Sequence, residues 1–384
     1  MKVLFITSWY PTKNNPNFGI FVKEHAKAIQ TTDVELVVLA VVTERSNSFF
    51  KINIRNYQDD SGFQIVEILI SSRFRDLIYH IIPLQNRIAY HIFNKQIAQE
   101  FNPDIVHSNV VFPAGMIGDF ISKKLRKPHI ITEHWSKIAG ILQKPYLSEL
   151  TRNTYRNAVR ILPVSEFLKN NIMKLFPEFK SEKFQIVPNV INSQTFTYKK
   201  KKPNAEELRF CAIATWATKK VPDKKPELFI KALAQIQQKT EKKITLNMIG
   251  GGDRVDELKK LCDQQPYKIE FLGYQTKEEI ALILQNSDFL VHASTIETFG
   301  VVLVEAMMTG TPVICSNVAA LPELINKTNG VLCDNTVESW VEGIEKALNL
   351  KFNTEEIADK VKNEYSLESV GKKIYSVYKE LISK

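Results

Sequence analysis

The chain has 384 residues, about the length of two ordinary domains, and its 44% apolar and 24% charged content is typical of a folded protein. No apolar run approaches the roughly 20 residues of a membrane-spanning helix, and the four cysteines show no CxxC pair or zinc-type spacing. The sequence therefore argues against an integral membrane protein and against a structural metal site. We expect buried, reduced thiols and a cytoplasmic location.

The net charge of +9 lies almost entirely in the first half of the chain. Residues 1–190 hold 24 Lys and Arg against 16 Asp and Glu, which is +8, and the remainder holds 27 against 26, which is +1. A basic surface attracts anions, so this half suits a phosphorylated substrate or an anionic membrane surface. No helix-turn-helix, zinc or aromatic RNA-binding signature accompanies the charge, and we expect no nucleic-acid partner.

Short β-branched runs alternate with amphipathic helical patterns along the first half of the chain. Helical patterns such as Phe18–Gln30 and Phe167–Phe176 separate the runs. Alternation of this kind predicts an α/β domain whose parallel sheet is covered by helices on both faces. The expected strands are Lys2–Thr7, Val34–Val42, Gln64–Ile70, Ile105–His107, His129–Thr132, Arg160–Val164 and Phe184–Val187.

The alternation stops over residues 191–207 and then restarts. This segment contains the basic run 199–202 and has no apolar period, so we expect a solvated linker. The sequence thus predicts two Rossmann-like doubly wound domains, 1–190 and 208–365, that face a central cleft. A final helix in 366–384 is expected to pack back on the first domain. The strands expected after the linker are Leu208–Ala214, Ile244–Ile249, Ile269–Leu272, Phe289–His292 and Val313–Cys315.

The residues after the expected strand Phe289–His292 carry the strongest functional signal. A turn at Glu297 precedes a helix that starts near Gly300 and ends at Gly310 in a left-handed cap. Free N–H groups at the start of a helix favour an anion. Glu305 lies inside this apolar helix, where an unpaired charge would be costly. Both carboxylates can border one pocket and accept hydrogen bonds from sugar hydroxyls, although a glutamate on a helix is more often simply solvated.

Three other segments place glycine or polar residues directly after expected strands. Gly250 and Gly251 form a tight turn after Ile244–Ile249, which allows a ligand to approach the backbone. His134 ends another strand, where it could donate to a phosphate or a sugar. The polar loop from residue 8 to Gly19 follows the first strand. Each has a purely structural alternative: a plain turn, a histidine satisfied by the backbone, and a surface loop.

The ordered set of these segments resembles the retaining nucleotide-sugar glycosyltransferases of family 4, which have the two-domain GT-B fold. The resemblance extends over nearly the whole chain. The motifs are WYPT (9–12), FGIFV (18–22), the turn at His134, VPNV (187–190), KKPEL (224–228), IGGG (249–252), FLGY (271–274), and Glu297 to Glu305 followed by GTPVI (310–314).

The resemblance implies roles for individual residues. Glu297 would contact the donor sugar, and Glu305 would bind the ribose hydroxyls. Main-chain groups around Phe299 would meet the sugar and the diphosphate, and Tyr274 would lie near the base. The donor-binding residues that it implies are Gly19, Gly250, Gly251, Tyr274, Phe299, Gly300, Val301 and Glu305.

The leaving diphosphate needs cations, and the sequence contains no evident metal-binding DxD triplet. The family places an arginine and a lysine after the first strand of the second domain. Here the arginine is missing, with Thr215 or Trp216 in its place. Lys224 corresponds to the lysine, and Lys219 and Lys220 are alternatives, unless all three belong to a solvated basic loop. We therefore expect a metal-independent enzyme that needs no cofactor.

The function expected is transfer of a sugar from a UDP- or GDP-sugar to a hydroxyl of a glycan or lipid-linked glycan, with retention of configuration. His134, Glu297 and Lys224 are the expected catalytic residues, with the donor on the second domain and the acceptor on the first. Two alternatives remain on the same fold: an inverting transferase or a sugar-nucleotide epimerase. A third is a catalytically inactive nucleotide-sugar-binding module.

The stretch from Arg73 to Arg87 mixes cations with bulky apolar residues. We favour a helix that covers the sheet of the first domain, since Pro83 interrupts a longer one. The alternative is a peripheral segment that docks on the inner face of a membrane.

Overall fold

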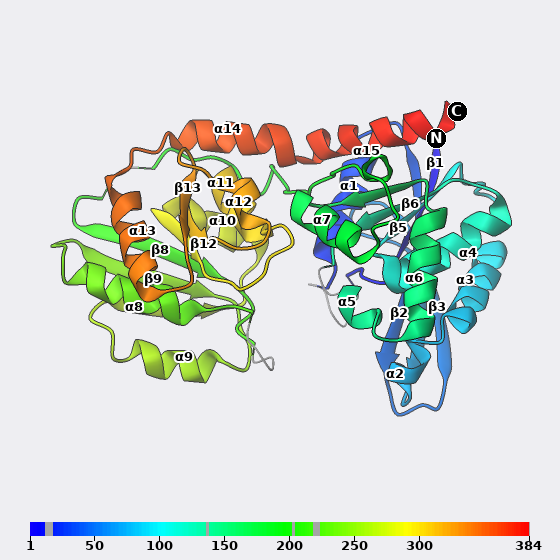
Figure 1. Cartoon of the computed structure of the whole chain (residues 1–384), viewed down its shortest axis with the longest axis horizontal. Coiled ribbons are helices and arrows are strands. Elements are labelled where there is room, and N and C mark those ends of the chain that lie inside the picture. Colours follow the sequence, from blue (N-terminus) through cyan, green and yellow to red (C-terminus); the bar gives the residue numbers. More distant parts are fainter. Residues whose placement is uncertain (12–17, 136–137, 202–203, 218–222, 384) are drawn as a thin grey trace. The chain divides into compact units, whose positions relative to one another are not determined.

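The computed structural model describes residues 1–11, 18–135, 138–201, 204–217 and 223–383 (Figure 1). The chain folds into two compact units. Unit 1 contains Met1–Val190 and Leu367–Lys384, and unit 2 contains Ile191–Ser366. Each unit is an α/β structure built on a largely parallel sheet, which confirms the predicted fold class.

Unit 1 is built on a seven-stranded sheet with the order β3-β4-β2-β1-β5-β6-β7. All neighbouring strands are parallel except β3, which lies at the edge and is antiparallel to β4. The strands are β1 (Lys2–Thr7), β2 (Glu35–Arg45), β3 (Lys51–Gln58), β4 (Gln64–Ser72), β5 (Ile105–Asn109), β6 (His129–Glu133) and β7 (Arg160–Pro163). The helices are α1 (Ile20–Gln30), α2 (Arg75–Ile78), α3 (Ile82–Gln96), α4 (Met116–Leu125), α5 (Ile138–Ile141), α6 (Pro145–Asn157), α7 (Glu166–Leu175) and α15 (Leu367–Ile382), with short turns η1 (Val111–Gly115) and η2 (Ser181–Lys183).

Helices cover both faces of this sheet because its central strands are apolar on both sides. On β1, Val3 and Phe5 are buried with residues of α1 and α15. Leu4 and Ile6 of the same strand are buried with residues of α3 and α4. Successive side chains of a strand point to opposite faces, so one strand contributes to two cores.

The C-terminal helix α15 is part of unit 1. It crosses α1 so closely that a Cβ atom at Gly371 would lie 2.1 Å from the carbonyl oxygen of Ala28. The hydroxyl of Tyr378 lies 2.6 Å from Nδ1 of the buried His107. The last helix therefore closes one face of the unit 1 sheet.

Unit 2 is built on a six-stranded parallel sheet with the order β10-β9-β8-β11-β12-β13. The strands are β8 (Glu207–Ile213), β9 (Lys243–Ile249), β10 (Lys268–Gly273), β11 (Phe289–His292), β12 (Val313–Ser316) and β13 (Gly330–Cys333). The helices are α8 (Pro226–Gln237), α9 (Val255–Cys262), α10 (Lys277–Asn286), α11 (Val301–Met308), α12 (Leu321–Leu324), α13 (Val337–Asn349) and α14 (Thr354–Tyr365).

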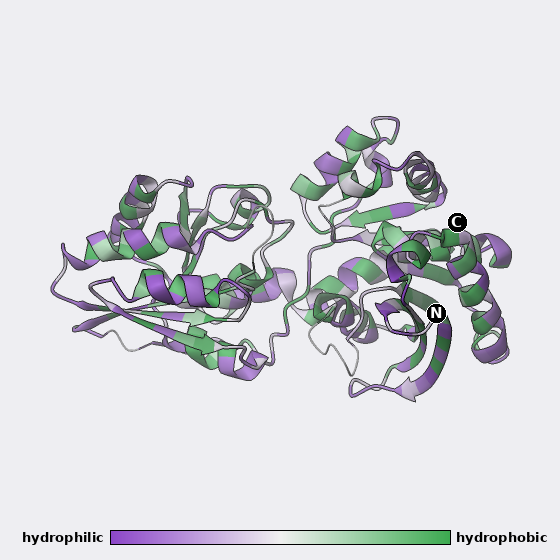
Figure 2. Cartoon of the chain, turned by 90° about the horizontal axis from the view of Figure 1, so that it is seen from below, coloured by the Kyte–Doolittle hydropathy of each residue, from purple (hydrophilic) through white to green (hydrophobic). Residues whose placement is uncertain are grey.

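In Figure 2 the strands are mostly apolar, whereas the helices carry both apolar and polar residues. Phe229 of α8 and Trp340 of α13 are both buried, and their ring centroids lie 5.8 Å apart. No helix in the described part of the chain is both long and apolar enough to cross a bilayer.

Two strands of the structure are absent from the sequence prediction, and one predicted strand does not form. The unpredicted strands are β3 and β13. The sequence predicts a strand at Phe184–Val187, but this segment makes only an isolated bridge between Phe184 and Ile161. The segment still runs beside β7, because the N–H groups of Gln185 and Val187 donate to the carbonyl oxygens of Ile161 and Pro163 at 3.0 and 3.1 Å.

The segment expected to be a solvated linker is packed on unit 2. The ammonium of Lys201 donates to Thr311 Oγ1 at 2.6 Å and to the carbonyl oxygen of Ser287. Burial lowers the pKa of Lys201 to about 8. The expectation that the basic run stays in solvent is therefore wrong for Lys201, since hydroxyl and carbonyl groups satisfy its charge.

Candidate functional site

The topology of unit 2 marks one edge of its sheet for ligand binding. β8 lies between β9 and β11, so the chain winds from β8 first in one direction and later in the other. In such sheets, ligands bind beyond the carboxyl ends of the strands at the point of reversal. Here the chain leaves β8 at Ile213 and leaves β11 at His292. The two segments that follow contain Lys224 and Glu297.

Backbone pairing holds these two segments together. Lys224 and Ser294 form an antiparallel bridge. Next to it, the main-chain N–H of Thr295 donates to the carbonyl oxygen of Asp223 at 2.8 Å. The pairing places the side chain of Lys224 beside that of Glu297, which follows Thr295 by two residues.

Glu297 is the centre of a charged cluster with Lys224 and His292. The Lys224 ammonium forms an ion pair with Oε1 of Glu297, and Nε2 of His292 lies 2.8 Å from the same oxygen. Burial tends to raise the pKa of Glu297, whose side chain is 17% exposed, but Lys224 and His292 bring it down to about 2. Burial and the Lys224 charge lower the pKa of His292. Glu297 is therefore an anion, and a neutral His292 donates its Nε2–H to it.

Helix α11 begins directly after this cluster. Its N-terminal cap, Gly300, has a φ of 97°, and a Cβ atom there would lie 2.9 Å from Cδ2 of Leu321. Phe299 is buried and its ring centroid lies 5.6 Å from that of Tyr365. The first N–H groups of a helix have no acceptor within the helix, so those near Gly300 and Val301 are suited to an anion. The left-handed cap predicted at the other end is observed, with φ 80° at Gly310.

Glu305 lies in the second turn of α11 and is only 2% exposed. Lys277, the first residue of α10, forms an ion pair with its Oε1. Its Oε2 is buried and has no hydrogen-bond partner among the described residues. A buried carboxylate oxygen without a donor is costly, so Oε2 is an open acceptor suited to a ligand hydroxyl.

The turn after β9 packs against the turns that follow β8 and β10. The N–H of Gly250 donates to the carbonyl oxygen of Gly273 at 2.7 Å, and Trp216 donates to that of Gly251 at 2.9 Å. A Cβ atom at Gly251 would lie 2.6 Å from the ring of Tyr274. That ring is 67% exposed and lies over the glycine turn, as an aromatic face available to a planar ligand.

Arg254 supports the backbone that carries Lys224. Its buried guanidinium donates from Nη1 to the carbonyl oxygen of Lys224 at 3.3 Å, and its Nη2 lies 3.0 Å from Glu257. Thr215 and Trp216 stand where the family resemblance implies an arginine. Arg254 instead reaches the same loop from the segment before α9 and fixes its backbone.

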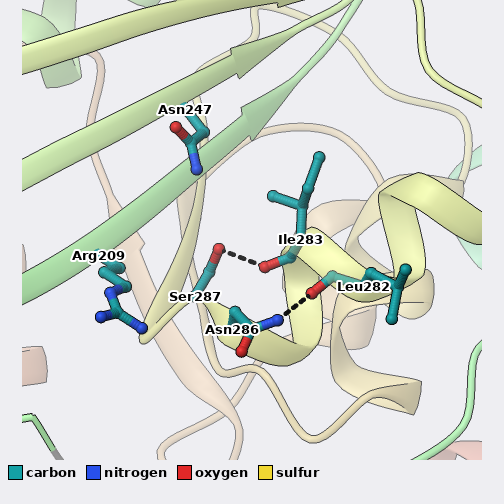
Figure 3. Close-up of a pocket in the computed structure, with 6 residues that line it drawn as sticks. All are labelled: Arg209, Asn247, Leu282, Ile283, Asn286 and Ser287. Carbon is teal, nitrogen blue, oxygen red and sulfur yellow. Dashed lines mark hydrogen bonds between the residues drawn. The ribbon is translucent and has the colours of Figure 1, made fainter.

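A pocket of about 290 Å³ lies elsewhere in unit 2 (Figure 3). It is beside the residues that lead into β11, and so lies away from Glu297, which follows that strand. Two of its polar side chains belong to the end of α10 and bond back to that helix: Ser287 Oγ donates to the Ile283 carbonyl and Asn286 Nδ2 to the Leu282 carbonyl, both at 2.8 Å. Because these two side chains already have partners and the pocket lies away from Glu297, it is a weaker candidate for the site. The lining residues are Arg209, Asn247, Leu282, Ile283, Asn286 and Ser287.

In unit 1, His134 follows the carboxyl end of β6 and is buried. Its Nδ1 lies 2.9 Å from Oδ1 of Asn189, and its Nε2 lies 3.4 Å from Oδ1 of Asn109. Burial, aided by the neighbouring His25, lowers the pKa of His134 well below its ordinary value. A neutral His134 therefore donates from Nδ1 to Asn189.

The turn that holds His134 is built around the buried carboxylate of Glu133. Oε1 accepts from the main-chain N–H groups of His134 and Trp135, both at 3.1 Å. Oε2 accepts from the N–H of Val111 and the hydroxyl of Tyr155, both at 2.9 Å. Burial raises the pKa of Glu133 to about 7 against these bonds. One carboxylate thus fixes both the turn and the orientation of the histidine.

Gly19 begins α1 with a φ of 73°. A Cβ atom there would lie 2.3 Å from the carbonyl oxygen of Trp9, so the chain after β1 passes directly against the start of this helix. Residues 12–17 of the same loop lie outside the described residues.

The predicted site residues fall into three groups: those outside the described residues, those in unit 1 and those in unit 2. Lys219 and Lys220 lie outside the described residues, so the structure bears only on Lys224. Among the described residues, no group of three or more His, Cys, Asp and Glu could hold a metal ion. The residues of unit 1 are Gly19 and His134, and those of unit 2 are Lys224, Gly250, Gly251, Tyr274, Glu297, Phe299, Gly300, Val301 and Glu305.

His292, Arg254 and Lys277 were missed by reasoning from the sequence. A signal existed for His292, a lone histidine in the apolar strand β11 only five residues before Glu297. Arg254 and Lys277 had no comparable signal. Arg254 reaches Lys224 from the turn after β9, and Lys277 reaches Glu305 from the turn after β10.

Two family models match the chain in consecutive halves. The model described as Glycosyltransferase Family 4 matches residues 19–195, and that described as Glycosyl transferases group 1 matches residues 201–364. The chain belongs to this family of GT-B glycosyltransferases, as the motif resemblance implies.

Similar proteins match most or nearly all of the chain. An uncharacterized glycosyltransferase of Methanocaldococcus jannaschii is 25% identical over 99% of this chain and 99% of its own. The alpha-monoglucosyldiacylglycerol synthase of Streptococcus pneumoniae is 26% identical over 77% of this chain and 71% of its own. The crystal structure of Anabaena HepE in complex with UDP and glucose has a TM-score of 0.68 at 17% identity, covering 99% of this chain and 100% of that chain. The last likeness is one of fold.

Proposed function

We propose that this glycosyltransferase moves a sugar from a nucleoside-diphosphate sugar to a hydroxyl acceptor, with retention at the anomeric carbon and without a metal ion. The observation that carries the proposal is the cluster of Lys224, Glu297 and His292 at the start of α11. It combines a cation, an anion and helix N–H groups at the ligand-binding edge of unit 2. A sugar attached to a diphosphate needs all three.

Each group of the cluster suits a different part of the donor. Lys224 and the main chain at Gly300 and Val301 would neutralise the diphosphate, and Lys219 or Lys220 could add to this charge. Glu297 would accept hydrogen bonds from sugar hydroxyls, because a pKa of about 2 keeps it ionised. Loss of one preorganised donor of this kind costs about 2.7–4 kcal/mol of transition-state stabilisation.

The nucleoside would bind further along the same edge. The unpartnered Oε2 of Glu305 would accept from a ribose hydroxyl. Tyr274, which lies over Gly251 in the turn after Gly250, would contact the base. We propose UDP or GDP as the nucleotide.

The leaving diphosphate would take part in its own displacement. The bond between the anomeric carbon and the diphosphate oxygen breaks, and the acceptor oxygen bonds to the same face of the sugar. The acceptor proton passes to the leaving phosphate oxygen. Glu297 does not serve as the acid here, because the ion pair with Lys224 holds it deprotonated.

We propose that unit 1, which holds most of the net positive charge, binds the acceptor. Gly19 and His134 lie beyond the carboxyl ends of its strands β1 and β6. The acceptor is a glycan or a lipid-linked glycan, and the pneumococcal relative is named for synthesis of a glucosylated lipid.

The test is turnover of UDP- and GDP-sugars, with the anomeric configuration of the product read by proton NMR. Retention supports the proposal. An inverted product would identify an inverting transferase, and isomerised sugar nucleotide without transfer would identify an epimerase. Donor binding with no turnover on any acceptor would identify a binding module.

A further inference from the structure

Exposed apolar side chains gather in one part of unit 1. Among the described residues, 14 large apolar side chains are exposed, and eight of them fall between residues 49 and 81. Phe49 and Leu77 are 68% and 64% exposed. Single exposed apolar residues need no explanation, but a group of them marks an interaction surface. We name as the tip of unit 1 the residues Phe49, Phe50, Phe74, Leu77 and Ile81.

The tip is a defined structure at the ends of β2 and β4. The main-chain N–H of Arg73 donates to the carbonyl oxygen of Ser48 at 2.7 Å, which ties the segment after β4 to the segment after β2. The rings of Phe49 and Phe74 meet edge to face with centroids 5.5 Å apart. Figure 1 shows α2 beside the ends of β2 and β3. The exposed rings of Phe49 and Phe74 are therefore presented together, and Leu77 lies on the short helix that follows Phe74.

Basic side chains accompany the apolar ones. The guanidinium of Arg73 lies 5.3 Å from the ring centroid of Phe49 and 4.9 Å from that of Phe74. Arg45 and Arg75 share a single carboxylate, that of Asp76. The cations of the region are Arg45, Lys51, Arg73 and Arg75, and the carboxylates are Glu44 and Asp76. The region is thus both apolar and positively charged.

We propose that the tip docks on a membrane surface that carries anionic lipids. Phenylalanine and leucine side chains enter the boundary between headgroups and acyl chains, and arginines pair with lipid phosphates. Near an anionic surface each basic residue contributes about 1 kcal/mol, which is roughly fivefold in affinity. The charge of the tip has the sign that such a surface attracts.

The sequence allows two roles for residues 73–87: a helix that covers the sheet, or a segment that docks on a membrane. In the structure, different parts of this segment suit the two roles. Helix α3 buries Ala89, Ile92 and Phe93 against the sheet, as a covering helix does. The short helix α2 before it instead exposes Leu77. The membrane alternative therefore applies to α2 and the loops beside it, and the covering helix begins at Ile82.

A second copy of the chain fits the tip less well. A symmetric contact would bring the basic residues of one tip against the same residues of the other, and like charges repel. The neighbouring edge strand β3 carries Lys51 and Arg55, and exposed charges on an edge strand oppose pairing with another chain.

The tip lies at the end of the sheet where the parallel strands terminate, and the proposed acceptor residues lie at the same end. The strands β1, β2, β4 and β6 of this sheet run in the same direction. Arg45 and Ser72 therefore end their strands at the edge where Thr7 and Glu133 end theirs, next to His134. Docking holds this edge at the bilayer, so the acceptor is a hydroxyl of a membrane lipid or lipid-linked glycan. This second step rests on the proposed function.

The experiment is co-sedimentation of the full chain with vesicles of phosphatidylcholine, with and without phosphatidylglycerol. We expect binding only to the anionic vesicles and weakening by added salt. The double variant F49S/L77S and the variant R73Q should each bind several-fold more weakly. Leu282→Ser, at a leucine of unit 2 that is 56% exposed, is the matched control and should bind as the wild type does.

Folding and donor binding are checked on the same variants. Circular dichroism and the thermal shift with UDP should match those of the wild type, because the tip contains none of the proposed donor residues. Wild-type binding by F49S/L77S, or no binding of the wild type to anionic vesicles, would overturn the proposal. So would a dimer that F49S/L77S dissociates in sedimentation velocity. Loss of the UDP shift in the wild type would instead count against the proposed function.

Discussion

Lys224 and Glu297 form an ion pair across 73 residues of sequence. The contact exists because the backbone at Lys224 pairs with Ser294, just after β11. A diphosphate bound near the start of α11 would compete with Glu297 for the Lys224 ammonium. A donor bound there would therefore be coupled to the orientation of the carboxylate through one lysine.

Replacing Lys224 by alanine should lower kcat by about 10²–10³, because a preorganised cation at the diphosphate is lost. The measurement is steady-state turnover of the donor sugar. Lys225→Ala is the matched control, since the ion pair with Glu297 is made by Lys224 and not by the adjacent lysine, and this variant should keep turnover near that of the wild type. Equal losses in both variants would contradict the role of Lys224.

Replacing His292 by leucine should lower kcat roughly tenfold while UDP affinity stays near the wild-type value. The imidazole donates to Glu297, and a hydrogen bond to a charged group is worth about 1.5–3 kcal/mol. His292→Gln keeps an N–H donor and should recover much of the loss. If leucine and glutamine behave alike, His292 acts through packing alone.

Replacing Glu305 by glutamine should weaken UDP binding about tenfold, because the open Oε2 is the proposed acceptor for a ribose hydroxyl. Titration calorimetry with UDP and 2′-deoxy- or 3′-deoxy-UDP tests this directly. The wild type should discriminate against one of the deoxy nucleotides, and Glu305→Gln should discriminate less. Glu278→Gln, at an exposed residue next to Lys277, is the control. Undiminished discrimination in Glu305→Gln would remove the assignment.

The stability of the protein should show the low pKa of Glu297. The folded value is about 2 against an ordinary 4.5, so the ionised carboxylate stabilises the fold above pH 4.5. That contribution is lost as the pH falls from 4.5 towards 2. Unfolding free energies of the wild type and Glu297→Gln should therefore differ at pH 6 and converge towards pH 2. A constant difference over this range would contradict the depressed pKa.

The central strands and the turn from Glu297 to Gly300 could be predicted because local sequence determines them. Val3–Ile6 is apolar on both faces, and Gly300 and Gly310 mark the ends of α11. The edge strand β3 was missed because most of its residues face solvent and show no buried pattern. The four-residue strand β13 was also missed.

Contacts between distant turns could not be predicted from the sequence. Arg254 meets the carbonyl oxygen of Lys224, and Lys277 meets Glu305, only because neighbouring strands bring their turns to one edge. Lys201 was expected in solvent because its chain neighbours are basic. Its partners, Ser287 and Thr311, lie 86 and 110 residues away.

The central claim is that unit 2 binds a nucleoside diphosphate through Lys224 and Glu305. The most direct measurement is the thermal shift of the full chain with UDP, GDP and ADP, repeated with Lys224→Ala and Glu305→Gln. At 100 times its dissociation constant a nucleotide stabilises by about 2.7 kcal/mol, so at least one should raise the unfolding midpoint of the wild type and do so less in both variants. No shift with any nucleotide, or equal shifts in all three proteins, would contradict the account.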